Sequence, residues 1–282
     1  MIIAVSDVHL GWKDEGKQEE FLKFLNACNT PDVDHFVLCG DIFDLWRRTN
    51  CNIFSAPEKC EQKIRSIVRK NEAIFDKLSS LEAKNVHYVA GNHDYLIHRI
   101  AEESEYYPFS VKKTLRLVDE GKKYYFTHGY DIDVMATMEN LMTVAQYEQL
   151  SERLCFLTDK TGWLASTIWK TTEILDTMKD KVKTLQSAPA ERSAEMDSIR
   201  LFAGSAARNL FLGLKSDENL VFGHTHVPYV DEVKPGVRVG NTGAWGEDLI
   251  NPENGKVSRN SYVRIQEGKM ELKFYHGENP VG

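Results

Sequence analysis

The sequence predicts an α/β protein in which a helix-covered sheet is followed by a long helical stretch and a second group of strands. In the first half, short apolar runs alternate with segments of helical periodicity. From Asp131 to Lys215 glycine and proline become rare, and beyond it short alternating segments are separated by Gly, Pro and Asn turns. A chain of 282 residues, of which 42% are hydrophobic, is long and apolar enough to bury a sizeable core.

Five apolar, β-branched runs have the length of buried strands and are expected to be central strands. They cover residues 2–5, 36–39, 86–89, 124–126 and 220–222. Apolar residues at helical spacing lie between the first three runs, at Phe21, Leu22, Leu25 and Cys28 and then at Ile64, Ile67, Val68, Phe75, Leu78 and Leu81. The alternating segments 237–239, 262–265 and 272–274 predict half-exposed strands of a second sheet.

The stretch that lacks turn residues predicts a helical insertion over residues 133–215, within a core formed by residues 1–132 and 216–282. Its apolar residues are spaced as in amphipathic helices that pack together or onto the body. Breaks at Gly162 and at residues 187–189 would divide the insertion into about three helices.

Charge and cysteine content narrow the classes of function. The chain has 35 Lys and Arg against 42 Asp and Glu, and the net charge of −7 weighs against broad binding to nucleic acid or to anionic membranes. Five cysteines without a CxxC spacing fit a reducing compartment. The N-terminus lacks the features of a signal peptide and no apolar run reaches membrane-spanning length, so we expect a cytoplasmic protein with peripheral membrane contact at most. These features favour no particular oligomeric state.

Residues that can bind a metal follow each of the five predicted central strands. Because open α/β sheets bind ligands beyond the carboxyl ends of their strands, we expect the five loops to converge on one site. Seven oxygen and nitrogen donors suit Mn²⁺ first, with Fe²⁺ or Zn²⁺ as alternatives, and are too many for one tetrahedral ion. They would serve two ions about 3.5–4 Å apart. The seven are Asp7, His9, Asp41, Asn92, His128, His224 and His226.

The order of these motifs resembles the calcineurin-like metallophosphoesterase superfamily, whose series is DxH, GDxxD, GNHD, a later His and GHxH. The resemblance implies a sandwich of two sheets flanked by helices, in αββα layers, and hydrolysis of a phosphoester or pyrophosphate bond by metal-activated water. By motif position, Asp7, His9, Asp41 and His226 would bind the first metal. Asp41, Asn92, His128 and His224 would bind the second, so that Asp41 bridges.

Further residues near these motifs receive candidate roles, of which that of His93 comes from the same resemblance. His93 would donate a proton to the leaving oxygen with Asp94 orienting it, although a purely structural role for His93 is the alternative. Asp44 is expected to support the ligands by hydrogen bonding, or else to cap its loop. Arg47 and Arg48 are expected either to clamp a non-bridging phosphate oxygen or to be solvated loop charges.

The sequence from Gly40 to Trp46, the insertion, and the turn Asn241-Thr242-Gly243-Ala244-Trp245 resemble the branch that contains UDP-2,3-diacylglucosamine diphosphatase. That branch implies a small phosphorylated, nucleotide-linked or lipid-like substrate beneath a helical cap. Better-known members of that branch carry Arg where this chain has His93. In this respect the chain is more similar to phosphodiesterases and nucleases of the superfamily. Trp163, Trp169 and Phe211 are candidates to line an acyl pocket or are ordinary packing residues.

Three alternative functions stay beside this hypothesis. A DNA nuclease and a cyclic-nucleotide phosphodiesterase use the same metal chemistry, but the acidic chain lacks the basic stripe of a DNA groove. A scaffold protein that has kept the fold and lost the chemistry is the alternative outside enzymes. Such a scaffold has no need to retain the full set of donors, which this chain has.

Overall fold

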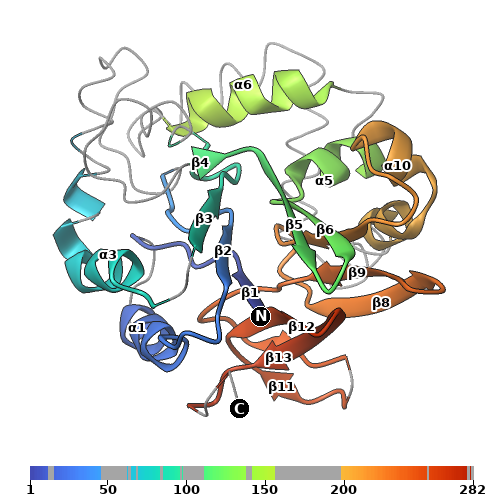
Figure 1. Ribbon diagram of the computed structural model, residues 1–282. Helices are drawn as coiled ribbons and strands as arrows, with labels where there is room; N and C mark the ends of the chain where they lie inside the picture. The colour runs from blue at the N-terminus through green and yellow to red at the C-terminus, as the bar shows by residue number, and fades with distance from the viewer. Residues whose placement is uncertain are drawn as a thin grey trace.

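The computed structural model describes residues 1–11, 16–45, 62, 65–67, 69–82, 85–95, 97, 111–137, 142–155, 198–252, 254–277 and 280. Two β-sheets pack face to face and helices cover the outer faces (Figure 1). The predicted αββα sandwich is therefore confirmed. Arg47, Arg48, Trp163 and Trp169 lie outside the described residues.

The larger sheet has six strands in the order β13-β12-β1-β2-β3-β4. β1, β2, β3 and β4 are parallel, while β12 and β13 extend the sheet antiparallel beside β1. Ile2 pairs with His35 on one side and with Ile265 on the other. The strands are β1 (Ile2–Val5), β2 (His35–Cys39), β3 (Asn85–Val89), β4 (Val111–Lys112), β12 (Ser261–Gln266) and β13 (Lys269–Phe274).

The second sheet has five strands in the order β5-β6-β7-β9-β8, with β6, β7 and β9 parallel. Its strands are β5 (Thr114–Asp119), β6 (Lys122–Thr127), β7 (Asn219–Phe222), β8 (Tyr229–Lys234) and β9 (Val237–Asn241). A short hairpin of β10 (Leu249–Ile250) and β11 (Val257–Ser258) lies apart from both sheets in the pairing.

All eight predicted strands are present, but the sequence assigned several of them to the wrong sheet. β6 and β7, expected beside β1 to β3, belong to the five-stranded sheet, and the C-terminal strands divide between the two sheets. The physical reason is that periodicity reports which faces of a strand are buried and not which strand is its neighbour. β7, for example, is buried along its whole length in the five-stranded sheet.

The core between the sheets explains the continuous apolar runs. Ile2 and Ala4 of β1 face the five-stranded sheet, where they share a core with Phe126 and Val221. The alternate residues Ile3 and Val5 face the helices α1 (Lys17–Ala27) and α3 (Glu72–Ser79). Both faces of the strand are thus dry, as the apolar sequence requires.

Helices also cover the outer face of the five-stranded sheet. Ile132 of α5 (Tyr130–Thr137) and Ile199 and Ala203 of the helical residues 198–204 bury against Leu220 and its neighbours. Both described ends of the predicted insertion, residues 133–137 and 198–215, thus adjoin the body, and a cap formed by the rest stays a prediction.

Two further helices lie within the range of the predicted insertion. In α6 (Val144–Cys155), Tyr147 stacks on Tyr130 of α5 with ring centroids 5.8 Å apart. In α10 (Ala207–Phe211), Phe211 packs beside Phe202 and remains 51% exposed. None of the helices in the described part of the chain is long and apolar enough to cross a bilayer.

Candidate metal centre

The predicted donors meet where the strand ends of the two sheets adjoin. β1, β2 and β3 of one sheet and β6 and β7 of the other each lead into a donor loop. Asp7 N–H donates to Gly40 O at 3.0 Å within the first sheet, and Gly223 N–H donates to His128 O at 2.8 Å within the second. His224 N–H donates to Asp7 Oδ2 at 3.0 Å and links the two sheets. The carboxyl ends of both sheets therefore form one site.

Several donor residues have an unusual backbone conformation. The φ angle is positive at Asp7 (53°), His9 (51°), Asp41 (53°), His224 (68°) and His226 (59°). Positive φ costs residues other than glycine roughly 1–2 kcal/mol, although Asp and His adopt it more often than most. Such strain concentrates at functional sites, where the surrounding structure holds the backbone in place.

Two glycines allow the loops to approach each other closely. A Cβ atom added to Gly40 would overlap the ring of His128, and one added to Gly91 would overlap the carboxylate of Asp41. Both side chains are donors and neither has room to withdraw in the buried site. Only glycine at these two positions allows the donors to lie where they are found.

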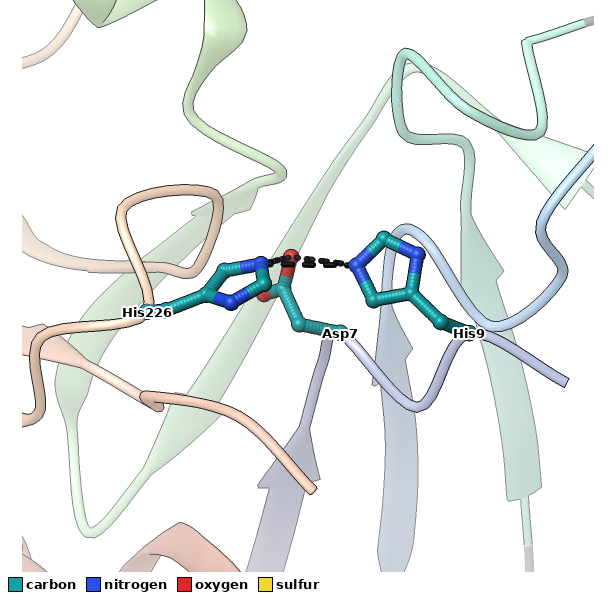
Figure 2. Close-up of side chains that lie close together, drawn as sticks. All are labelled: Asp7, His9 and His226. Carbon is teal, nitrogen blue, oxygen red and sulfur yellow. Dashed lines mark hydrogen bonds and ion pairs between the residues drawn. The ribbon is translucent and has the colours of Figure 1, made fainter. Parts of the chain in front are cut away.

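The first donor group consists of Asp7, His9 and His226 (Figure 2). Asp7 Oδ1 lies 3.2 Å from Nε2 of His226 and 3.7 Å from Nε2 of His9. The two Nε2 atoms are 3.4 Å apart, and all three donor atoms lie within 4.8 Å of one another. Asp7 and His9 are buried, while the side chain of His226 is partly exposed.

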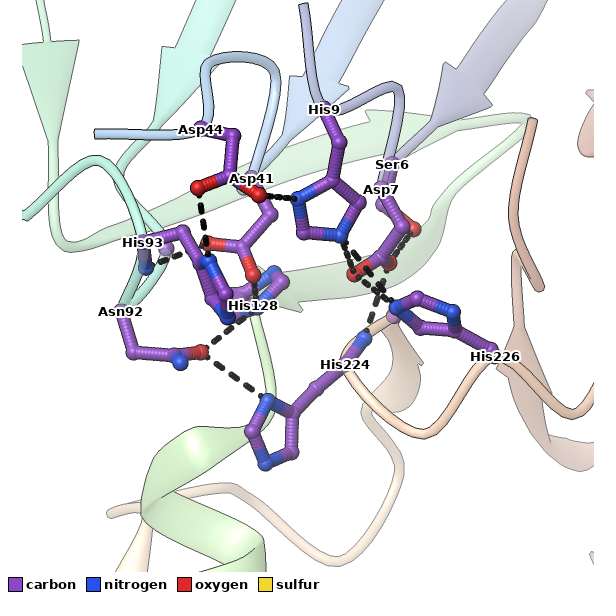
Figure 3. Close-up of polar contacts among 12 residues, drawn as sticks. Ser6, Asp7, His9, Asp41, Asp44, Asn92, His93, His128, His224 and His226 are labelled. Carbon is purple, nitrogen blue, oxygen red and sulfur yellow. Dashed lines mark hydrogen bonds and ion pairs between the residues drawn. The ribbon is translucent and has the colours of Figure 1, made fainter. Parts of the chain in front are cut away.

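The second donor group consists of Asp41, Asn92, His128 and His224 (Figure 3). His128 Nε2 lies 3.2 Å from Asp41 Oδ2 and 3.1 Å from Asn92 Oδ1. Nδ1 of His224 lies 3.0 Å from the same Asn92 oxygen. The structure thus brings together all seven donors that the sequence singled out.

Asp41 lies between the two groups. Its carboxylate is within 4.8 Å of donor atoms of Asp7 and His128 and, in a second combination, of His9 and His93. Asp41 is therefore the residue that lies within reach of donor atoms of both groups.

The charges at the site are those of a cation-binding centre. Burial would raise the pKa of Asp7, but His226 and His128 lower it to about 2. His128 and His226 show the reverse balance, because burial lowers the pKa of each ring and neighbouring carboxylates raise it to about 10. The principal carboxylates are Asp41 for His128 and Asp7 for His226. In the absence of a metal ion, the carboxylates therefore favour the protonated form of these two histidines.

A divalent ion fits the residues that are present. Carboxylate, amide and imidazole donors suit Mn²⁺, Fe²⁺ and Zn²⁺. Asp7 Oδ1 is buried and has no hydrogen bond of good geometry among the described residues, although two imidazole nitrogens face it. A buried carboxylate oxygen that faces two imidazole nitrogens gains an electrostatic partner when a cation replaces the protons on the histidines.

His93 lies beside the first donor group and contacts Asp44. Asp44 Oδ1 is 3.4 Å from His93 Nδ1, and Asp44 Oδ2 is 3.4 Å from His9 Nδ1 (Figure 3). The main-chain N–H of His93 donates to Asp41 Oδ1 at 2.8 Å. Burial lowers the pKa of His93, while Asp41 and Asp44 oppose the shift. The carboxylate of Asp44 therefore lies beside both the donor residue His9 and His93.

Asp94, which the sequence suggested as the residue that orients His93, makes its hydrogen bonds in the described part of the chain to other groups. Its carboxylate accepts hydrogen bonds from Ile42 N–H at 2.8 Å, from Gly91 N–H at 2.6 Å and from the hydroxyl of Tyr88. Burial and the nearby Asp41 raise its pKa to about 6. Asp94 therefore fixes the loops after β2 and β3, and the contact with His93 belongs to Asp44.

Two carboxylates at the site were missed by sequence reasoning. Asp133 Oδ2 lies 3.0 Å from His224 Nε2, and Glu247 Oε2 lies 2.9 Å from His226 Nδ1. Neither belongs to a donor motif, and acidic residues are too common for either to stand out. Asp133 was placed at the start of the insertion, whereas the structure shows it in α5 against the donor loops.

The search among curated proteins found no match to this chain. Several solved structures are similar to it. A dimetal phosphatase from Danio rerio is 12% identical, with a TM-score of 0.46 over 97% of this chain and 95% of the other. An archaeal phosphodiesterase is 13% identical, with a TM-score of 0.39 over 97% and 99% of the two chains. A predicted phosphoesterase from Streptococcus pneumoniae is 14% identical, with a TM-score of 0.35 over 97% and 87%.

The family comparison covers most of the chain. The sequence profile of the calcineurin-like phosphoesterases matches residues 1–228, a range that holds all seven donors. The chain therefore belongs to the calcineurin-like phosphoesterase family and is a metal-dependent phosphoester hydrolase.

Proposed function

We propose that the protein uses two divalent ions, with Mn²⁺ as the preferred ion, to hydrolyse a phosphoester or pyrophosphate bond in a small phosphorylated molecule. The observation that carries this proposal is the pair of donor groups joined by Asp41, with His93 beside them. Asp7, His9, Asp41 and His226 would hold one ion. Asp41, Asn92, His128 and His224 would hold the other.

The bound ions would supply an activated water and positive charge for the phosphoryl oxygens. The chain itself supplies orientation. Hydrogen bonds from main-chain N–H groups between the donor loops, including the one from His224 N–H to the Asp7 carboxylate, would fix the donors before substrate arrives. Such preorganisation supports catalysis because the site need not rearrange as charge develops on the phosphoryl group.

His93 is proposed to give a proton to the leaving oxygen. The carboxylate of Asp44, whose Oδ1 lies 3.4 Å from His93 Nδ1, would orient the ring for this step. Burial lowers the pKa of His93, which makes the protonated ring a stronger acid. The proposed pathway needs no covalent bond between the enzyme and the phosphoryl group.

A nucleotide-linked or lipid-like substrate is the narrower proposal, and the resemblance to the diacylglucosamine diphosphatase branch supports it. His93, which stands where that branch has Arg, supports the second candidate, a cyclic-nucleotide phosphodiesterase. Rates on a UDP-linked acyl sugar and on a cyclic nucleotide would distinguish the two. Preferred hydrolysis of the sugar nucleotide supports the first substrate class, and preferred hydrolysis of the cyclic nucleotide supports the second.

The proposed activity has a direct test. Metal-stripped protein is given Mn²⁺, Fe²⁺ or Zn²⁺ and bis-p-nitrophenyl phosphate, and the release of nitrophenolate is measured. We expect turnover by the wild type and none by Asp41→Asn, since Asn keeps the left-handed backbone but loses the bridging charge. Asp248→Asn, at an exposed residue that pairs with Arg259, is the matched control. A folded wild type without turnover under any of these ions would favour the scaffold alternative.

A further inference from the structure

We propose that Asp133 and Glu247 are positioning residues, each of which orients one histidine of the Gly223-His224-Thr225-His226 turn toward a different metal ion. This inference rests on the proposed two-metal function and adds two residues to it. It follows from which ring nitrogen of each histidine faces the donors and which faces a carboxylate.

His224 faces the donor groups through its Nδ1 atom. That atom lies 3.0 Å from Asn92 Oδ1, while Nε2 on the opposite side of the ring lies 3.0 Å from Asp133 Oδ2. Asp133 is itself held, because the hydroxyl of Thr137 donates to its Oδ1 at 2.7 Å. The carboxylate is therefore fixed on α5 with one oxygen directed at His224.

His226 faces the donor groups through its other ring nitrogen, Nε2. Its Nε2 faces Asp7 Oδ1 at 3.2 Å, and its Nδ1 lies 2.9 Å from Glu247 Oε2. Glu247 follows the 241–245 turn, far from Asp133 in the sequence. The two neighbouring histidines thus face the donors through opposite nitrogens, and each has a carboxylate on its outer nitrogen.

A carboxylate on the outer nitrogen determines which tautomer the ring adopts. It accepts the single N–H of the neutral imidazole, so the lone pair remains on the nitrogen that faces the metal. Because the histidines present opposite nitrogens, one turn needs two carboxylates on different sides. Asp133 would serve the group of Asn92 and His128, and Glu247 the group of Asp7 and His9.

The two carboxylates differ in solvent exposure, and this difference predicts which of them has the larger effect on metal affinity. The side chain of Asp133 is 12% exposed and that of Glu247 is 45% exposed. Water competes more readily for the exposed contact, so its loss weakens orientation less. Asp133 should therefore have the larger effect of the two.

The inference is tested by titrating Mn²⁺ into metal-stripped Asp133→Asn and Glu247→Gln by calorimetry. Loss of a supporting partner typically lowers metal affinity about 10–100-fold. We expect each variant to weaken one of two binding events, and a different one. His9→Ala and Asn92→Ala identify which event belongs to which donor group. The visible absorption of Co²⁺-loaded protein should change in both positioning variants, because the ligand field depends on ring orientation.

Matched controls are Asp131→Asn, also on α5, and Asp248→Asn, next to Glu247. Asp131 contacts Thr127 and Asp248 contacts Arg259, and neither touches the two histidines. Both controls should bind Mn²⁺ as the wild type does. If Glu247→Gln, at a partly exposed side chain that does not endanger folding, also bound as the wild type, the role of Glu247 would be overturned while the proposed function stood.

Two other outcomes are decisive. Weakening of the same binding event by Asp133→Asn and Glu247→Gln would overturn the assignment of one carboxylate to each ion. A folded wild type that binds no Mn²⁺ would instead overturn the proposed function on which the inference rests.

Discussion

Histidines lie close together in two regions of the molecule, one within the six-stranded sheet and one where the two sheets adjoin, and their environments are opposite. Toward the amino ends of β2 and β3, His35 Nδ1 lies 2.9 Å from His87 Nε2. Burial, His35 and Lys112 lower the pKa of His87 to about 4. At the carboxyl ends, the pKa of His128 and of His226 is raised to about 10.

The difference shows what makes a histidine cluster bind a cation. Burial lowers the histidine pKa in both regions, so burial does not distinguish them. The neighbours do, because His87 faces another imidazole and a lysine, whereas His226 faces the buried carboxylate of Asp7. A cluster of imidazoles alone rejects positive charge, and buried carboxylates reverse this preference.

The largest expected effect comes from removing the carboxylate that distinguishes the two regions. Asp7→Asn should lower the pKa of His226 in metal-free protein from about 10 toward its ordinary value, since Asp7 is the main group that raises it. Mn²⁺ affinity should fall by more than about a hundredfold, beyond the range of a supporting residue. NMR titration of the histidines and calorimetry measure the two effects. An unchanged His226 pKa would contradict the comparison.

A smaller effect is expected from His93→Ala. A positioned acid contributes about 10²–10⁴-fold when the leaving group is poor. Hydrolysis of an alkyl phosphodiester should therefore fall at least about a hundredfold, and hydrolysis of a nitrophenyl ester much less. The ratio of the two rates is the measurement. Equal losses on both substrates would argue against proton donation.

The next expected effect separates Asp44 from Asp94. Asp44→Asn should reduce activity about 10–100-fold, because Asp44 contacts both His9 and His93. Asp94→Asn should lower the free energy of unfolding instead, since its carboxylate accepts bonds from two loops. Leaving-group dependence should change in the first variant and stay unchanged in the second. The opposite result would return the role of orienting His93 to Asp94.

The smallest expected effect lies at the other histidine cluster. The pKa of His87 is lowered in the folded state from 6.5 to about 4, so the unfolded chain binds its proton first as the pH falls. The free energy of unfolding should therefore decrease as the pH falls from 6.5 toward about 4, by about 1 kcal/mol once solvent screening is considered. Urea unfolding of wild type and His87→Gln measures the effect. An identical pH dependence in both proteins would exclude this contribution.

The site was more predictable from sequence than the arrangement of the strands. Each donor loop carries its own local pattern, such as Gly40-Asp41 or Gly223-His224, because a close turn and a ligand are needed at one point. The choice of which strand pairs with which leaves no such local pattern in the sequence. β7 and β1 have similar apolar sequences, yet they lie in different sheets.

Contacts made through the outer nitrogens of the histidines were the least predictable. Asp133 and Glu247 reach the site from segments that are distant from the motifs, and their positions depend on how α5 and the turn after β9 pack. Residues 156–197 lie outside the described part of the chain, so the predicted cap stays a prediction.

The hydrogen bond from His224 N–H to Asp7 Oδ2 joins the two sheets at the point where catalysis is proposed. Four of the seven donors follow strands of the six-stranded sheet and three follow strands of the five-stranded sheet, so a small slippage between the sheets would separate the donors while every strand stayed paired. We expect enzymatic turnover to disappear at a lower urea concentration than the far-ultraviolet circular dichroism signal. Turnover would then serve as an early sensor of sheet separation.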